Sequence, residues 1–120
     1  MDSNELLQKT KSFALNTIKF FQNLPRTEES RILGKQLLRS STSIAANYRA
    51  ACRSRSMQEF YAKLCIVIEE SDETLFWLEL LNDSGIVDSE KVNFLKNEAD
   101  ELLFIFSASR KSVKKGLSNK

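Results

Sequence analysis

The chain contains no histidine, one proline, three glycines and two cysteines among its 120 residues. The lack of histidine excludes His general bases, Ser-His-Asp and Cys-His nucleophile systems, and His-liganded metal sites. Four Gly and Pro residues are too few for an all-β fold, which needs a turn signal about every 8 to 12 residues. Two cysteines cannot build a structural zinc site, and Cys52 and Cys65 do not have Cys-x-x-Cys spacing. We therefore expect a helical protein that is not an enzyme, holds no metal or cofactor, and uses both cysteines as reduced packing residues.

Targeting and membrane-spanning signals are also lacking. The first five residues, MDSNE, carry acidic groups where a secretory signal carries basic ones, and no apolar segment follows them. The longest uncharged apolar-rich run covers residues 102–109, far short of the roughly 20 residues that span a bilayer. We expect a cytoplasmic protein without a transmembrane segment.

Apolar residues instead recur at helical spacing along almost the whole chain. The pattern is interrupted at three places by residues that end one helix or cap the next. These residues are Pro25 and Thr27, Ser54 or Ser56, Gly85, and Asp88 or Ser89. The sequence predicts helices at about 3–23, 28–55, 57–82 and 89–113, with a frayed basic tail over 113–120. Four helices joined by short loops are typical of an all-α, antiparallel up-and-down four-helix bundle, here a single domain over residues 1–120.

The second and third predicted helices each have a distinguishing feature. Small Ser and Ala residues crowd the middle of the second helix, and Gly34 adds another, so we expect a neighbouring helix to approach it closely. Tyr48 lies at the edge of its core stripe and is expected to be buried. The third helix is apolar on two faces, with Ile66, Trp77 and Leu80 opposite its main stripe. We expect these three residues to form an interface in a homo-oligomer.

The formal net charge of +2 hides strong segregation of charge along the chain. Residues 31–55 hold six basic residues and no acidic one, residues 56–109 hold twelve acidic residues and three basic ones, and residues 110–120 hold five basic ones. At 100° per residue, five cations of the second helix share a strip about 80° wide, opposite the core and about 33 Å long. They are Arg31, Lys35, Arg39, Arg49 and Arg53, and Arg55 follows in the same acid-free segment.

The strip has three interpretations. In the first, the strip is a nucleic-acid-binding surface, because Lys and Arg neutralise phosphates and the planar guanidinium of Arg can bind a phosphate through two hydrogen bonds. In the second, the strip is a solvated helix face or pairs with acidic residues of the third helix. In the third, the strip binds an acidic protein partner. The acidic residues Glu69 and Glu73 share a helix face, but no second carboxylate helix completes a metal site, so their role is expected to be structural.

A longer stretch of sequence resembles a known family. Residues 37–56, LLRSSTSIAANYRAACRSRS, and residues 69–81, EESDETLFWLELL, closely resemble the bacterial four-helix-bundle proteins called 23S rRNA intervening sequence proteins, or S23 proteins. The resemblance implies a small up-and-down bundle that assembles as a homopentamer. It also implies kinship with the accessory protein of diversity-generating retroelements, a basic pentamer that engages nucleic acid and a reverse transcriptase. The arginines of that motif match Arg39, Arg49, Arg53 and Arg55.

Two functional hypotheses follow. The first is a non-enzymatic homo-oligomer that binds RNA or other nucleic acid through the basic strip. The second is a structural or adaptor oligomer with a protein partner, in which acidic residues of the third helix neutralise the strip. A helical ribonuclease of the HEPN type is disfavoured because its Arg-x-x-x-x-His motif needs a histidine.

Overall fold

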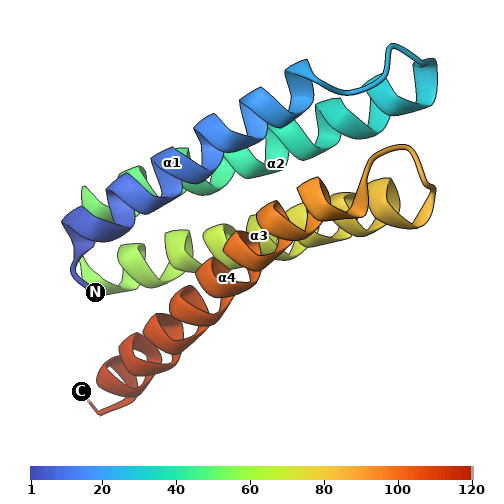
Figure 1. Cartoon of the computed structure of the whole chain (residues 1–120). Coiled ribbons are helices and arrows are strands. Elements are labelled where there is room, and N and C mark those ends of the chain that lie inside the picture. Colours follow the sequence, from blue (N-terminus) through green and yellow to red (C-terminus); the bar gives the residue numbers. More distant parts are fainter. Residues whose placement is uncertain (120) are drawn as a thin grey trace.

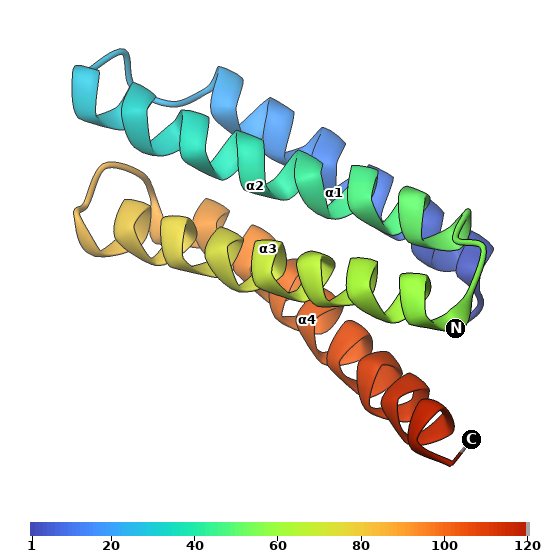
Figure 2. The same ribbon diagram turned by 180° about the vertical axis from the view of Figure 1, so that it is seen from behind.

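The computed structural model describes residues 1–119 and is an up-and-down bundle of four helices (Figure 1). The helices are α1 (Ser3–Gln22), α2 (Glu28–Cys52), α3 (Met57–Asp83) and α4 (Ser89–Ser118). Each helix packs against the next one in the chain, and α1 contacts α4 much less than it contacts α2. The bundle measures 52 × 22 × 21 Å, and α4 leans away from its neighbours toward its C-terminal end (Figure 2). The predicted fold class is therefore confirmed.

Side-chain caps set the start of every helix, because the first N–H groups of a helix have no partner within it. The capping residues are Asp2, Thr27, Ser56 and Asp88, and each accepts a hydrogen bond from a backbone N–H of the first turn. Gly85 follows α3 with φ of 75°, a left-handed conformation that costs L side chains roughly 1–2 kcal/mol. The predicted N-caps and the predicted glycine stop are thus confirmed, with the open choices resolved to Ser56 and Asp88.

Two predicted helix ends are wrong. The second helix ends at Cys52 and not near residue 55, because Ser56 is already extended as the cap of α3 and the residues between must reverse the chain. The expected fraying from residue 113 is not found, since α4 continues through Ser118. Lys114 and Lys115 are good helix formers and their charges oppose the negative end of the helix dipole. The last residue of the predicted tail, Lys120, lies outside the described residues.

The core lies where the predicted apolar stripes meet. Its largest fully buried side chains include Phe13 of α1, Leu37 of α2, Leu78 of α3 and Phe106 of α4. Tyr48 is buried as expected, and its ring centroid lies 5.1 Å from that of Phe106. Burying side chains of this size contributes roughly 1.5–3 kcal/mol each, and such burial is the main favourable contribution to folding.

Small residues of α2 bring its neighbours close, as predicted. A Cβ on Gly34 would lie only 2.5 Å from Cδ1 of Leu24, just after α1. On the side of α3, the hydroxyl of Thr74 lies 2.8 Å from that of Ser40, within the buried interface. Buried hydroxyls such as that of Thr17 donate to carbonyls of their own helix, which leaves the apolar packing undisturbed.

No helix within residues 1–119 is both long enough and apolar enough to cross a bilayer. This agrees with the short apolar runs of the sequence.

Candidate nucleic-acid interface

The six cations of the predicted site all lie on the surface. Arg31, Lys35, Arg39, Arg49, Arg53 and Arg55 are each exposed, on the outer side of α2 and in the turn that follows it. Their exposure agrees with the predicted position of the strip opposite the core. Their surroundings, however, differ from one end of α2 to the other.

The middle of the strip is occupied by an ion-pair cluster with α3. Nη1 of Arg39 lies 3.2 Å from Oε2 of Glu70, and its Nη2 pairs with Oε1 of Glu73. Glu73 also accepts a hydrogen bond of 3.1 Å from Nε1 of Trp77. The hydrogen bond from Arg39 holds the pKa of Glu73 below its ordinary value, and the same contact raises the pKa of Arg39. The pairing required by the adaptor hypothesis is therefore present at Arg39.

Arg55 makes a weaker contact. Its Nε lies 3.8 Å from Oε2 of Glu59 one turn along, and 92% of its side chain is exposed. An exposed pair of this kind is worth little, because solvent screens it and two long side chains must be ordered. Arg55 therefore remains available to another anion.

The four remaining cations of the strip are free of carboxylates. Within residues 1–119, no Asp or Glu oxygen lies within 4.0 Å of the charged nitrogens of Arg31, Lys35, Arg49 or Arg53. Arg31 lines a small groove of ≈ 290 Å³ at the loop between α1 and α2, together with Arg26. The predicted continuous strip is thus divided by the cluster at Arg39 into two separate basic regions.

The second of these regions is a groove of ≈ 710 Å³ between the start of α1 and the end of α2. Arg49 and Arg53 line it from α2, and Lys11 lines it from α1. We call this the α1/α2 groove. Lys11 was not singled out in the sequence, because residues 1–30 hold equal numbers of acidic and basic residues. The antiparallel register of an up-and-down bundle is the signal that could have found it, since the start of the first helix must lie beside the end of the second.

Cys52 also lines the α1/α2 groove. Its thiol is free and exposed, whereas Cys65 is free and half-buried. The prediction that both cysteines are packing residues is therefore wrong for Cys52, because this last residue of α2 is exposed and lines both this groove and a neighbouring hollow beside Tyr48.

The fold also separates charge along the long axis of the bundle. The termini lie at one end (Figures 1 and 2), where the up-and-down topology brings together residues 1–12, 41–69 and 104–119. This end holds ten Lys and Arg residues against four Asp and Glu residues, whereas residues 13–40 and 70–103 hold seven against twelve. The formal charges are +6 and −5. The α1/α2 groove lies at the basic end, where the summed field attracts anions.

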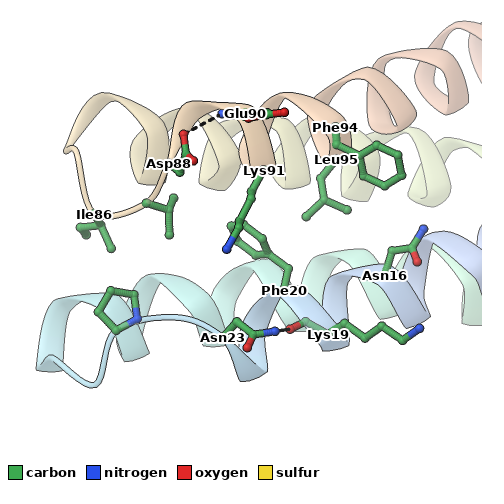
Figure 3. Close-up of a pocket in the computed structure, with 12 residues that line it drawn as sticks. Asn16, Lys19, Phe20, Asn23, Ile86, Asp88, Glu90, Lys91, Phe94 and Leu95 are labelled. Atoms are coloured by element: carbon green, nitrogen blue, oxygen red, sulfur yellow. Dashed lines mark hydrogen bonds between the residues drawn. The ribbon is translucent and has the colours of Figure 1, made fainter.

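A groove of similar size lies between α1 and the start of α4 (Figure 3). Phe20 and Leu95 point into it from the two helices, and its lining includes two basic and two acidic residues. One of the acids, Asp88, already caps α4 by accepting a hydrogen bond of 3.3 Å from the backbone N–H of Glu90. Because its basic and acidic lining residues balance, this groove should attract anions less than the α1/α2 groove, whose lining is basic.

The residues predicted for an oligomer interface lie along the outer side of α3. Ile66 is 41% exposed, and Trp77 and Leu80 are half-buried. Phe76, which sequence reasoning missed, is 49% exposed and packs edge-on against Trp77 at 5.1 Å. Side chains of this kind on one side of a helix form an apolar patch at the surface.

Within residues 1–119, no three or more His, Cys, Asp or Glu side chains gather so that they could hold a metal ion. Glu70 and Glu73 are engaged by Arg39 as described, and Glu69 is exposed. The acidic residues of α3 thus contribute charge and ion pairs.

Comparison with known proteins supports the resemblance noted in the sequence. The family profile of the 23S rRNA-intervening sequence protein matches residues 2–108. The crystal structure of a protein of unknown function from the S23 ribosomal protein family of Bacteroides thetaiotaomicron superposes with a TM-score of 0.86 at 32% identity. That match covers 92% of this chain and 99% of the other. The search of curated proteins finds no match. Sequence and structure agree, and the chain belongs to the 23S rRNA-intervening sequence protein family.

Proposed function

We propose that this protein is a non-enzymatic, homo-oligomeric bundle that binds RNA or other nucleic acid through the cations of α2. The observation that carries the proposal is that Arg31, Lys35, Arg49 and Arg53 are exposed and have no carboxylate partner within residues 1–119. Phosphate contacts from such residues give affinity that is largely independent of base sequence and falls steeply with salt.

Self-association is the second part of the proposal. Ile66, Phe76 and Trp77 place apolar surface on the outside of α3, where burial against another copy would remove it from water. In a closed ring of parallel protomers, the pentamer that the family resemblance implies, the basic ends of all copies would lie on one rim. Several weak phosphate sites would then act on one nucleic acid with raised effective concentration.

The binding experiment measures retention of a structured RNA at rising salt concentrations for the parent protein and for the variant R49A/R53A. We expect weaker binding for the variant, and a plot of log affinity against log salt that is flatter by roughly 1.5, since two phosphate contacts are lost. The matched control is K91A/K96A, which removes two positive charges from α4. Binding that is independent of salt, or equal for the parent protein and R49A/R53A, contradicts the proposal.

The oligomer is tested separately by light scattering. We expect a mass several times the 13.7 kDa of one chain, and a shift toward 13.7 kDa for Ile66→Asp, which places a charge in the apolar patch. Circular dichroism confirms that the variant is folded. A parent protein that stays at 13.7 kDa at micromolar concentration refutes self-association.

An adaptor oligomer that binds a protein remains the second candidate function, favoured by the ion pairs of Arg39 with Glu70 and Glu73. In that role the cations of α2 need not contact phosphate. Equal RNA retention by the parent protein, R49A/R53A and K91A/K96A is the result that this candidate predicts.

A further inference from the structure

Three cations converge on the α1/α2 groove from two different helices. Arg49 lies on α2, Arg53 is the residue directly after its end, and Lys11 lies across from them on α1 (Figure 1 shows the two helices side by side). Among the described residues, no Asp or Glu lines this groove. The nearby carboxylate of Asp2 is used as a helix cap, where it accepts a hydrogen bond of 2.8 Å from the backbone N–H of Glu5. The groove therefore combines three positive charges with no competing negative charge in its walls.

The rest of the lining is suited to a nucleotide. Leu7, Ala45 and Ala46 supply short or apolar side chains, and Asn4 adds an amide that can donate hydrogen bonds. Cationic groups beside apolar surface match a ligand in which phosphates alternate with sugars and bases. A volume of ≈ 710 Å³ lies within the range of roughly 300–1,000 Å³ that is typical of small-molecule sites.

The dimensions of the groove favour a single strand. Its walls run from Ser3 to Lys11 and from Thr42 to Arg53, which are about 12 and 16 Å of helix at 1.5 Å per residue. A concave site of this length accommodates a few nucleotides of a flexible strand. A duplex is a stiff rod and would touch only the rim of the groove.

We propose that the α1/α2 groove binds the phosphate backbone of a single-stranded nucleic acid, with Lys11, Arg49 and Arg53 contacting successive phosphates. This inference rests on the proposed function and adds to it a residue of α1 and a preferred form of nucleic acid. It also assigns different roles to the two basic regions of α2, because Arg31 and Lys35 lie outside the groove.

The experiment measures fluorescence anisotropy of a labelled oligouridine of ~10 nucleotides, within the site sizes known for single-strand binders. The variants are K11Q and R49Q/R53Q, and the matched control is K19Q/K91Q, which removes two exposed cations that line the groove between α1 and α4. We expect K11Q to reduce the salt slope by about 0.7 and R49Q/R53Q by about 1.4, as for single strands that lose one and two phosphate contacts. K19Q/K91Q should leave the slope unchanged. All changed residues are exposed, so folding should be retained, and thermal unfolding checks this.

Cys52 provides a second readout inside the groove. Bound oligouridine should slow alkylation of Cys52, while Cys65, which does not line the groove, should react at its original rate. A self-complementary RNA duplex and free uridine monophosphate are compared with oligouridine at equal nucleotide concentration. Both should protect Cys52 less.

The outcomes separate this inference from the proposed function. If R49Q/R53Q weakens binding and K11Q does not, the assignment of the binding site to the α1/α2 groove is wrong, whereas nucleic-acid binding through α2 stands. If the parent protein does not bind oligouridine or duplex RNA, or if no variant changes binding, both are wrong. Equal protection of Cys52 by uridine monophosphate would identify a small phosphorylated ligand, and equal protection by the duplex would remove the preference for a single strand. Either result overturns the inference.

Discussion

Gly34 offers a sharp test of how α1 and α2 pack. A Cβ at this position would lie 2.5 Å from Cδ1 of Leu24, and 3.0 and 3.1 Å from Cδ1 and Cε1 of Phe21. Ordinary carbon contacts are about 3.5–4.0 Å, so the added methyl group overlaps Leu24 by about 1 Å. Gly34→Ala therefore sets this overlap against the gain from replacing a glycine inside a helix.

The two effects can be compared in size. Replacing Gly by Ala in a helix interior stabilises by roughly 0.5–1 kcal/mol. Overpacking typically costs about 1–3 kcal/mol, and here the Leu24 side chain must change rotamer while the ring of Phe21 shifts by a few tenths of an ångström. We expect Gly34→Ala to lower the free energy of unfolding by about 1 kcal/mol. For a chain of this length that lowers Tm by roughly 4 °C.

Urea and thermal unfolding of Gly34→Ala, Leu24→Ala and the double variant measure the overlap directly. In the Leu24→Ala background the methyl group has lost its nearest neighbour, so Gly34→Ala should be neutral or stabilising, which gives a favourable coupling of about 1.5 kcal/mol. Gly116→Ala is the control, because nothing lies within 4 Å of a Cβ there. Additive effects of the two substitutions, or a stabilising Gly34→Ala in the parent protein, would refute close approach as the reason for glycine at position 34.

Three further predictions concern local chemistry. Gly85→Ala should lower the free energy of unfolding by about 1 kcal/mol, since φ is 75° there, whereas Gly85→Asn should cost less in the same urea titration. Burial raises the pKa of Tyr48, so its ionisation, followed by alkaline ultraviolet absorbance, should occur well above the ordinary phenol range. Stability should fall as pH rises above about 10, where the unfolded phenol ionises first, and Tyr48→Phe should reduce this loss. Because Arg39 lowers the pKa of Glu73, part of the stability present at neutral pH should disappear as pH falls through the ordinary Glu range toward the lowered pKa. Arg39→Gln should make this loss of stability at acid pH smaller. If the free energy of unfolding falls by the same amount at acid pH in the variant and in the parent protein, the ion pair is contradicted.

The site could be predicted from the sequence only in part. Helical geometry alone places Arg49 and Arg53 on the face of α2 opposite the core, and the structure agrees. Helical geometry does not show that Arg39, on the same strip, pairs with Glu73 across the interface with α3. Nor does helical geometry show that Lys11 lies across the groove from Arg49. Both relations join residues more than 30 positions apart, and the periodicity of one helix carries no information about them.

The sequence by itself determined the four helices, their caps and their buried stripes, because these depend on local spacing and on hydrogen bonds within a few residues. Membership of the family was also visible in the residues of α2 and α3. Only the tertiary structure decided which charges meet. The antiparallel packing of α1 on α2 and of α2 on α3 divides one basic strip into a paired middle and two free ends, and it joins one of those ends to Lys11. Electrostatic partners are set by distances through space, and these follow from how the helices pack.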